Sequence, residues 1–398
     1  MKIFTNLMKR QKRHQLQPQK HIGFENRITV DICLLWDCST EIVLFFAAIL
    51  GGVLAGCSKN EIESSNPQLI AFNTPVVGNA TKAAIVTNEY PTSIPFDVWA
   101  LFTDNKLNGD LDATGVNQYE YFKKIEFSYN GNSEHPSYVN SGAFWPKQNG
   151  YLTFKALSPA GVTNAENSWV KSTAGISIPY YTVNQDDLMY SDFAYDQTKS
   201  NETDKASDSD PFHYYEGNDI LFKHALSAIR FKVKLEAADV SSTVYQITSI
   251  KLFNHRTVGA FNEYASPQWS GQTAPIAKDQ SVTLELHNTG VNVPVNASPL
   301  ALYDGSTGVY IVLPQDLEYG DPATDVSVTI DYTEKIGGLT AQSVQADNVK
   351  LHNLSSVTTW DPGKIYTYTI IIGRDQIRLD PAVETWETNN VDVDGPKI

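Results

Sequence analysis

Apolar and polar residues alternate in several short segments of the chain. The clearest is 229–235, IRFKVKL, in which four apolar side chains share one face and three cations share the other. A period of two places successive side chains on opposite faces of a strand, so this segment predicts a half-buried β-strand. The same period recurs at 96–102, 152–156, 282–286, 309–313, 326–330 and 366–372. No stretch of about 12 residues shows a convincing apolar stripe with the helical period, and the pattern predicts an all-β protein.

Polar, glycine-rich turns separate the predicted strands. They include Asn130-Gly131, Asn149-Gly150, Asp304-Gly305 and Gly337-Gly338. Glycine and asparagine adopt the left-handed backbone of tight turns at little cost. Many short strands joined by such turns favour antiparallel β-sandwiches.

The stretch 196–218 is polar and contains almost no aliphatic side chains, which predicts a linker or a long surface loop. The chain has 398 residues, and a domain usually holds about 100–200 residues. We therefore expect two domains, at 66–215 and 216–398.

An uncharged run of 15 residues, 42–56, ends in Leu54-Ala55-Gly56-Cys57. A membrane-spanning helix needs about 20 apolar residues, so the run is too short for one but suits the core of a signal peptide. The small residues ahead of Cys57 resemble a bacterial lipobox. This predicts lipidation of Cys57, removal of the leader 1–56 and a polar tether at 57–65. Alternatively, the run is a buried helix with an incidental cysteine. Because 41 residues precede the run, either the leader is long or the translation start is placed too early.

The composition argues against several kinds of binding site. The formal net charge is −15, which argues against binding nucleic acid through its phosphates. The three cysteines, Cys33, Cys38 and Cys57, all precede the predicted body, so disulfides and cysteine-ligated metals are excluded there. The segments 390–395 and 104–109 imitate the start of a calcium loop, but neither has the acid required at its twelfth position.

Catalytic motifs are missing from the sequence. It contains no Gly-x-Ser-x-Gly, no His-Glu-x-x-His and no glycine-rich phosphate loop. A dispersed carboxylate pair for glycoside hydrolysis leaves no local signature, and the sequence nominates none. We therefore predict no catalytic residue, no metal and no cofactor.

A series of short motifs follows in order along the chain: 69–72 LIAF, 80–83 ATKA, 144–146 FWP, 152–159 LTFKALSP, 185–190 QDDLMY, 221–229 LFKHALSAI, 360–368 WDPGKIYTY and 383–386 VETW. Behind a lipobox, they resemble the fimbrillin-like family of Bacteroidales fimbrial subunits and related surface lipoproteins. The resemblance implies two transthyretin-like antiparallel β-sandwich domains in tandem. It also implies assembly by strand exchange, in which a protease removes an N-terminal strand after a basic residue and a strand of the next subunit fills the vacated groove.

The resemblance also implies roles for particular residues. Lys82, the only basic residue between Lys59 and Lys106, is the candidate cleavage site. Cleavage there would release the apolar strand candidate, which consists of Leu69, Ile70, Ala71 and Phe72. The candidate donor strands are 366–372 and 377–379; in the first, the side chains that would fill successive pockets are Tyr366, Tyr368, Ile370 and Ile372. The family often carries arginine at the position of Lys82, and in the alternative interpretation Lys82 is a solvated turn residue that is never cleaved.

The leading hypothesis is a structural or adhesive subunit of cell-surface fimbriae at the outer membrane, lipid-anchored at least as a precursor. Its partners would be other fimbrial subunits or copies of itself. The alternative is a monomeric outer-membrane surface lipoprotein that binds a glycan or a host protein. Exposed Trp145, Trp360 or Trp386 could stack on sugars in that case, whereas buried tryptophans would belong to the core. His224 is expected to be structural, and an enzyme is the least favoured class.

Overall fold

The computed structural model describes residues 68–78, 90–131, 137–199, 217–236, 243–273, 281–294, 298–302, 308–321, 323–352, 357–373 and 377–386. All of them belong to one compact unit of the chain, Ser65–Ile398. The predicted leader and tether, with Cys57, lie outside the described residues, and so does Lys82. Within the described ranges, no helix is long and apolar enough to cross a membrane.

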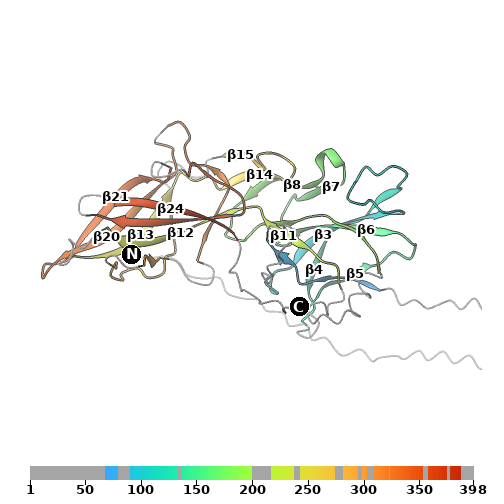
Figure 1. The fold of residues 1–398 in the computed structure, drawn as a ribbon, viewed down its shortest axis with the longest axis horizontal. Coiled ribbons are helices and arrows are strands. Elements are labelled where there is room, and N and C mark those ends of the chain that lie inside the picture. The colour runs from blue at the N-terminus through green and yellow to red at the C-terminus, as the bar shows by residue number, and fades with distance from the viewer. Residues whose placement is uncertain are drawn as a thin grey trace, which may run out of the picture. The chain divides into compact units, whose positions relative to one another are not determined.

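The described residues fold almost entirely as strands and turns (Figure 1), which confirms the prediction of an all-β protein. A first sheet surrounds an aromatic core that includes Phe96, Phe127 and Phe154. Its order is β1 (Leu69–Asn73), β5 (Ser137–Phe144), β4 (Gln118–Tyr129), β3 (Phe96–Thr103), β6 (Tyr151–Ser158), β9 (Met189–Ser191), β11 (Leu221–His224) and β2 (Val76–Val77), and β10 (Ala194–Gln197) also pairs with β6.

Two further sheets face each other across a second core. One has the order β17 (Leu300–Ala301), β12 (Ser227–Leu235), β23 (Lys364–Ile372) and β24 (Ile377–Thr385), with β18 (Tyr310–Val312) also paired to β12. The other has the order β16 (Ser281–Thr283), β13 (Thr243–Phe253), β20 (Ser327–Ile336) and β21 (Gln342–Lys350). The predicted alternation in β12 is confirmed, because Ile229, Phe231, Val233 and Leu235 are buried in this core.

A smaller sheet combines strands from both halves of the chain. Its order is β15 (Trp269–Thr273), β14 (Val258–Asn262), β8 (Gly175–Thr182) and β7 (Glu166–Ser168), the last followed by a short 3-10 helix, Lys171–Thr173. A two-stranded pair, β19 (Gln315–Asp316) and β22 (Thr359–Trp360), completes the described strands. Sheet membership therefore does not follow the predicted division at 215/216. β8 pairs with β14 across it, and β11, placed in the second domain by the sequence, belongs to the first sheet.

The strands at the centre of the first sheet are covered on both faces. All eight residues of β3 are buried: Val98 and Ala100 face the aromatic core, whereas Trp99 packs in a third apolar cluster on the other face. Trp145, Trp360 and Trp386 are also buried, in agreement with the core interpretation of these tryptophans.

His255 lies between β13 and β14 and is only 1% exposed. Neither ring nitrogen has a hydrogen-bond partner in the described part of the chain, and the ring of Tyr310 packs edge-on at 6.1 Å. Burial lowers the pKa of His255 to about 4, because the low-dielectric interior disfavours the charged imidazolium.

We expect His255 to make stability depend on pH. Below about pH 6.5 the unfolded histidine binds a proton, whereas the folded one stays neutral until about pH 4. The protein therefore loses about 3 kcal/mol of unfolding free energy as the pH falls from about 6.5 to about 4, and His255 does not change the stability above this range. In urea unfolding, the stability of His255→Gln minus that of the wild type should rise by about this amount from pH 6.5 to 4.

The control for this experiment is His287→Gln, which changes an exposed histidine. A stability difference between His255→Gln and the wild type that stays constant over the same pH range would contradict the assignment.

Candidate functional site

The segment Gln68–Gly78 lies between two strands that are far apart in the sheet order. Its first half, β1, pairs antiparallel with β5, and its second half, β2, pairs in parallel with β11. Among the described strands, β5 has β4 as its other neighbour and β11 has β9. The segment therefore occupies the position between two sheet edges, each of which would be unpaired on that side without it.

Backbone hydrogen bonds hold this segment along its length. The Trp145 amide donates to the Gln68 carbonyl at 3.0 Å, and the Asn218 amide donates to the Ala71 carbonyl at 2.9 Å. In the opposite direction, the segment's amides donate at 3.0 Å each to residues in and just before β11: Asn73 to Asn218, Val76 to Ile220, and Gly78 to Phe222. Regular pairing of this kind fixes a strand without specifying its side chains.

Alternate side chains of β1 point into the aromatic core. Ile70 and Phe72 are fully buried, whereas Leu69 is 37% exposed. The ring of Phe72 packs edge-on against Phe127 at 4.8 Å and Phe154 at 5.0 Å. Edge-to-face contacts at this spacing are the favoured geometry of aromatic pairs. Phe72 is thus the main apolar anchor of the segment.

Gly217 permits the close approach of the chain ahead of β11 to β1. A Cβ at this position would lie 2.6 Å from the amide nitrogen of Asn73 and 2.7 Å from the carbonyl carbon of Phe72. Both contacts are shorter than van der Waals distance and both involve backbone, so a larger residue would displace the segment. The sequence analysis did not single out Gly217 because it ends a polar stretch without a recognisable motif.

The predicted strand Leu69, Ile70, Ala71 and Phe72 therefore lies within β1, where the structure places it in the first sheet. The analysis missed β2. Its only signal was the apolar pair Val76-Val77, which is too short for a periodicity test. Whether Lys82 is cleaved stays a prediction, since it falls between described segments.

The predicted donor side chains lie in the interior of their own subunit. Tyr366, Tyr368, Ile370 and Ile372 are at most 2% exposed, and their strand, β23, pairs with β12 on one side and β24 on the other. The sequence analysis named both 366–372 and 377–379 as candidate donors and assigned the pocket-filling side chains to 366–372. The structure distinguishes them, because β24 is an edge strand of its sheet and β23 is not.

A cavity of about 110 Å³ lies where the end of β2 meets the end of β24. Gly78 and Trp386 both line it, together with Lys223 and His224. The imidazole of His224 stacks on the indole of Trp386 at 4.3 Å, and its Nδ1 lies 2.8 Å from Oδ2 of Asp187. These contacts agree with a structural role for His224 and leave a small space for a few water molecules.

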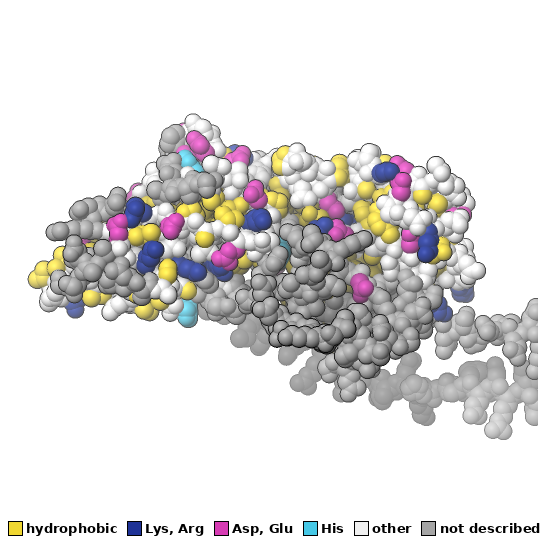
Figure 2. Space-filling model, in the orientation of Figure 1, with side chains coloured by type: hydrophobic (Ala, Val, Ile, Leu, Met, Phe, Trp, Pro, Cys, Tyr) yellow, Lys and Arg dark blue, Asp and Glu magenta, His cyan; other side chains and the backbone are white. Residues whose placement is uncertain are grey.

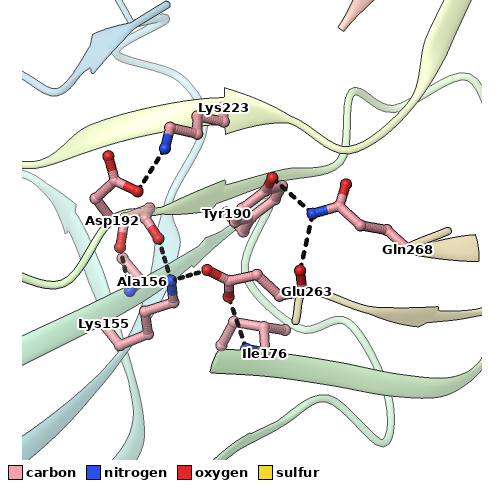
Figure 3. Close-up of polar contacts among 9 residues, drawn as sticks. Lys155, Ala156, Ile176, Tyr190, Asp192, Lys223, Glu263 and Gln268 are labelled. Atoms are coloured by element: carbon pink, nitrogen blue, oxygen red, sulfur yellow. Dashed lines mark hydrogen bonds and ion pairs between the residues drawn. The ribbon is translucent and has the colours of Figure 1, made fainter. Parts of the chain in front are cut away.

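A buried ion pair lies near Gln268, which lines this cavity and donates to the carbonyl of Glu263 (Figure 3). Lys155 of β6 is fully buried, and its Nζ donates to Oε1 of Glu263 at 2.6 Å and to the carbonyl of Ser191. The other carboxylate oxygen of Glu263 accepts from the Ile176 amide at 2.8 Å. Burial lowers the pKa of Lys155, and the carboxylate of Glu263 opposes the shift. The pair connects the first sheet to the turn after β14.

These features define a class of protein. It is an all-β body in which an N-terminal segment completes a sheet of the core, and no cluster of His, Cys, Asp and Glu side chains in the described residues could hold a metal. The model of the fimbrillin-like family matches residues 86–386. The chain belongs to the fimbrillin-like family.

Solved structures that match this chain come from species of Bacteroides and Porphyromonas. A fimbrial protein from Bacteroides vulgatus is 15% identical with a TM-score of 0.50, and the match covers 80% of this chain and all of that one. A putative cell adhesion protein from Bacteroides uniformis is 14% identical with a TM-score of 0.41, over 81% of this chain and 99% of that one. The tip fimbrial protein Mfa3 from Porphyromonas gingivalis is 10% identical with a TM-score of 0.33, over 80% and 99%. A search of curated proteins found no match.

Proposed function

We propose that this chain is a structural or adhesive subunit of cell-surface fimbriae that is exported as a lipoprotein and assembled by proteolytic activation and strand exchange. The observation that carries the proposal is the position of Gln68–Gly78 between β5 and β11. Family membership and the fimbrial protein of Bacteroides vulgatus support the fimbrial assignment.

The geometry gives activation a physical basis. Cleavage after Lys82 would separate both β1 and β2 from the body, because both precede it in the chain. Loss of the segment would expose the pockets of Ile70, Phe72 and Val77, and burying side chains of this kind contributes about 1.5–3 kcal/mol each. It would also leave β5 and β11 with unpaired amides and carbonyls, which another extended strand can satisfy.

The edge strand β24 is the favoured donor. It pairs only with β23 among the described strands, so its release costs one set of ladder hydrogen bonds. Release of β23 would in addition remove Tyr366, Tyr368, Ile370 and Ile372 from the second core. The donor is therefore proposed to be the C-terminal strand, with β23 remaining in its own subunit.

In this proposal, a lipid attached to Cys57 anchors the precursor to the cell surface. Processing at Lys82 would then free the subunit from this anchor, because Cys57 is on the released side. Subunits in a fibre and subunits on the membrane would differ at their N-terminus.

The N-terminal residue of the protein recovered from cells tests the proposal. Fimbriae should contain chains that begin at Ala83, and Lys82→Gln should leave only lipidated chains that begin at Cys57. In vitro, a trypsin-like protease should convert the purified precursor into a ladder of oligomers on unboiled gels, and Lys82→Gln should abolish the ladder.

Lys106→Gln is the matched control, since it removes an exposed lysine in the next stretch of the chain and should leave the ladder intact. If cleavage after Lys82 occurs and the product stays monomeric, strand exchange is wrong. A monomeric surface lipoprotein would then be the better assignment.

A further inference from the structure

The strand β21 forms a long edge of the sheet β16-β13-β20-β21, one of the two sheets around the second core. It pairs with β20 along one side, and no other described strand lies on its other side. An edge of this kind presents a row of unpaired backbone groups, and proteins usually protect such edges with charged residues, proline or a bulge. The edge strand of the facing sheet, β24, is protected in this way by Arg378, Asp380, Pro381 and Glu384.

β21 lacks this protection over its first five residues. From Ile336 to Ala346 the chain contains no charged residue and no proline, although the whole protein carries a net charge of −15. The bulge that could blunt the edge lies further on, where Asn348 has a φ of 54° and the register with β20 shifts. Gln342–Ala346 is therefore a regular and uncharged stretch of edge that no described strand covers on its outer side.

Exposed apolar side chains stand at the turn next to this edge. Ile336 and Leu339, on either side of Gly337-Gly338, are 50% and 66% exposed, and Val244 on the adjoining strand is 37% exposed. Hydrophobic side chains gather at the left end of the molecule in Figure 2, where Figure 1 places the end of β20. An apolar patch beside an open strand edge marks an interaction surface.

The edge can pair with a second copy of itself without charge repulsion. When two copies of Gln342–Ala346 run antiparallel and are centred on Val344, Ser343 lies opposite Gln345, and Gln342 lies opposite Ala346. No charge faces a like charge in this register, which is the arrangement that would weaken cross-strand pairing. Centring on Val344 also uses every regular residue ahead of the bulge. An isologous contact of this kind closes as a dimer with twofold symmetry.

We propose that β21 and the turn after β20 form a surface through which two copies of this chain associate, edge to edge, into one continuous sheet. The surface belongs to the sheet of β16, β13, β20 and β21, which does not include Gln68–Gly78, so the contact does not require removal of that segment. The contact through β21 would associate subunits or fibres laterally.

Single cysteines test the register directly, because the chain from residue 65 onward contains none. Facing residues of an antiparallel pair have Cβ atoms about 4.5–5.5 Å apart, which is close to the distance that a disulfide spans. Under mild oxidation, a mixture of Ser343→Cys and Gln345→Cys chains should form at least tenfold more disulfide dimer than either variant alone.

Val344→Lys places two like charges opposite each other and should abolish both the mixed disulfide and concentration-dependent dimerisation in sedimentation. Val170→Lys makes the same change at an exposed valine outside the proposed surface and should leave both unchanged; circular dichroism checks that each variant folds. Equal disulfide yields from the mixture and the single variants, or a protein that sediments as a monomer at every concentration, would overturn the proposal.

Discussion

Phe72→Ala should lower the unfolding free energy of the unprocessed protein by about 3–5 kcal/mol, the cost of truncating a fully buried phenylalanine. Phe72 is 0% exposed and its ring contacts three other core rings, those of Phe96, Phe127 and Phe154. The cavity left behind would lie between strands that cannot collapse onto it without breaking the pairing of β1. Chemical unfolding monitored by tryptophan fluorescence measures the change.

Leu69→Ala provides the matched control on the same strand. Leu69 is 37% exposed, so its truncation should cost well under half as much. A similar loss for both variants would mean that β1 does not insert Phe72 into the core in solution. Once the segment has been cleaved off and has left the body, a change at position 72 can no longer alter the stability of the body.

Disruption of the ion pair between Lys155 and Glu263 should cost about 3–5 kcal/mol, because it leaves a buried charge without its partner. The two variants are Lys155→Met and Glu263→Gln, measured by the same unfolding assay. Removal of both charges together should cost much less than the sum, since the double variant leaves neither charge uncompensated.

An exposed pair of similar length serves as the comparison. Lys171 lies 2.7 Å from Asp110, and both side chains are about half exposed. Lys171→Met should leave the unfolding free energy nearly unchanged, because water screens the interaction. If the losses at Lys155 and Lys171 were equal, the burial of Lys155 in the sheet would be wrong.

The sequence predicted the strands best where one face of a sheet meets solvent. In β12 the alternation of apolar and cationic residues matched the burial of each side chain. The sequence of β6 also alternates at 152–156, but both faces of this strand are buried, and Lys155 is 0% exposed. The structure buries Lys155 because a turn from the other half of the chain, with Glu263, covers that face. A pattern within one strand contains no information about what packs on its polar side.

For the candidate site too, the sequence indicated the strand itself but not the strands that pair with it. The apolar residues of β1 were visible as a strand candidate, and the buried positions of Ile70 and Phe72 agree with it. The partners of the segment were not predictable: β1 pairs with β5 and β2 with β11, both of which lie far along the chain, and nothing local indicates either pairing. The same holds for β23: its four alternating side chains suit a donor strand and an interior strand equally well.

Many contacts in this protein join residues that are far apart in the sequence and are therefore synthesised at different times. The hydrogen bond from the side chain of Asn218 to the Ala71 carbonyl spans 147 residues, and that from Arg230 to Thr367 spans 137. Pairings at such separation form slowly, because a long loop must close before any contact rewards the loss of chain entropy. On a growing chain, the second core cannot close until β23 has been synthesised, after β12, β13 and β20. The apolar face of β12 therefore waits for its parallel partner β23 while the strands between them are made, and the second core stays open to a binding chaperone throughout that interval.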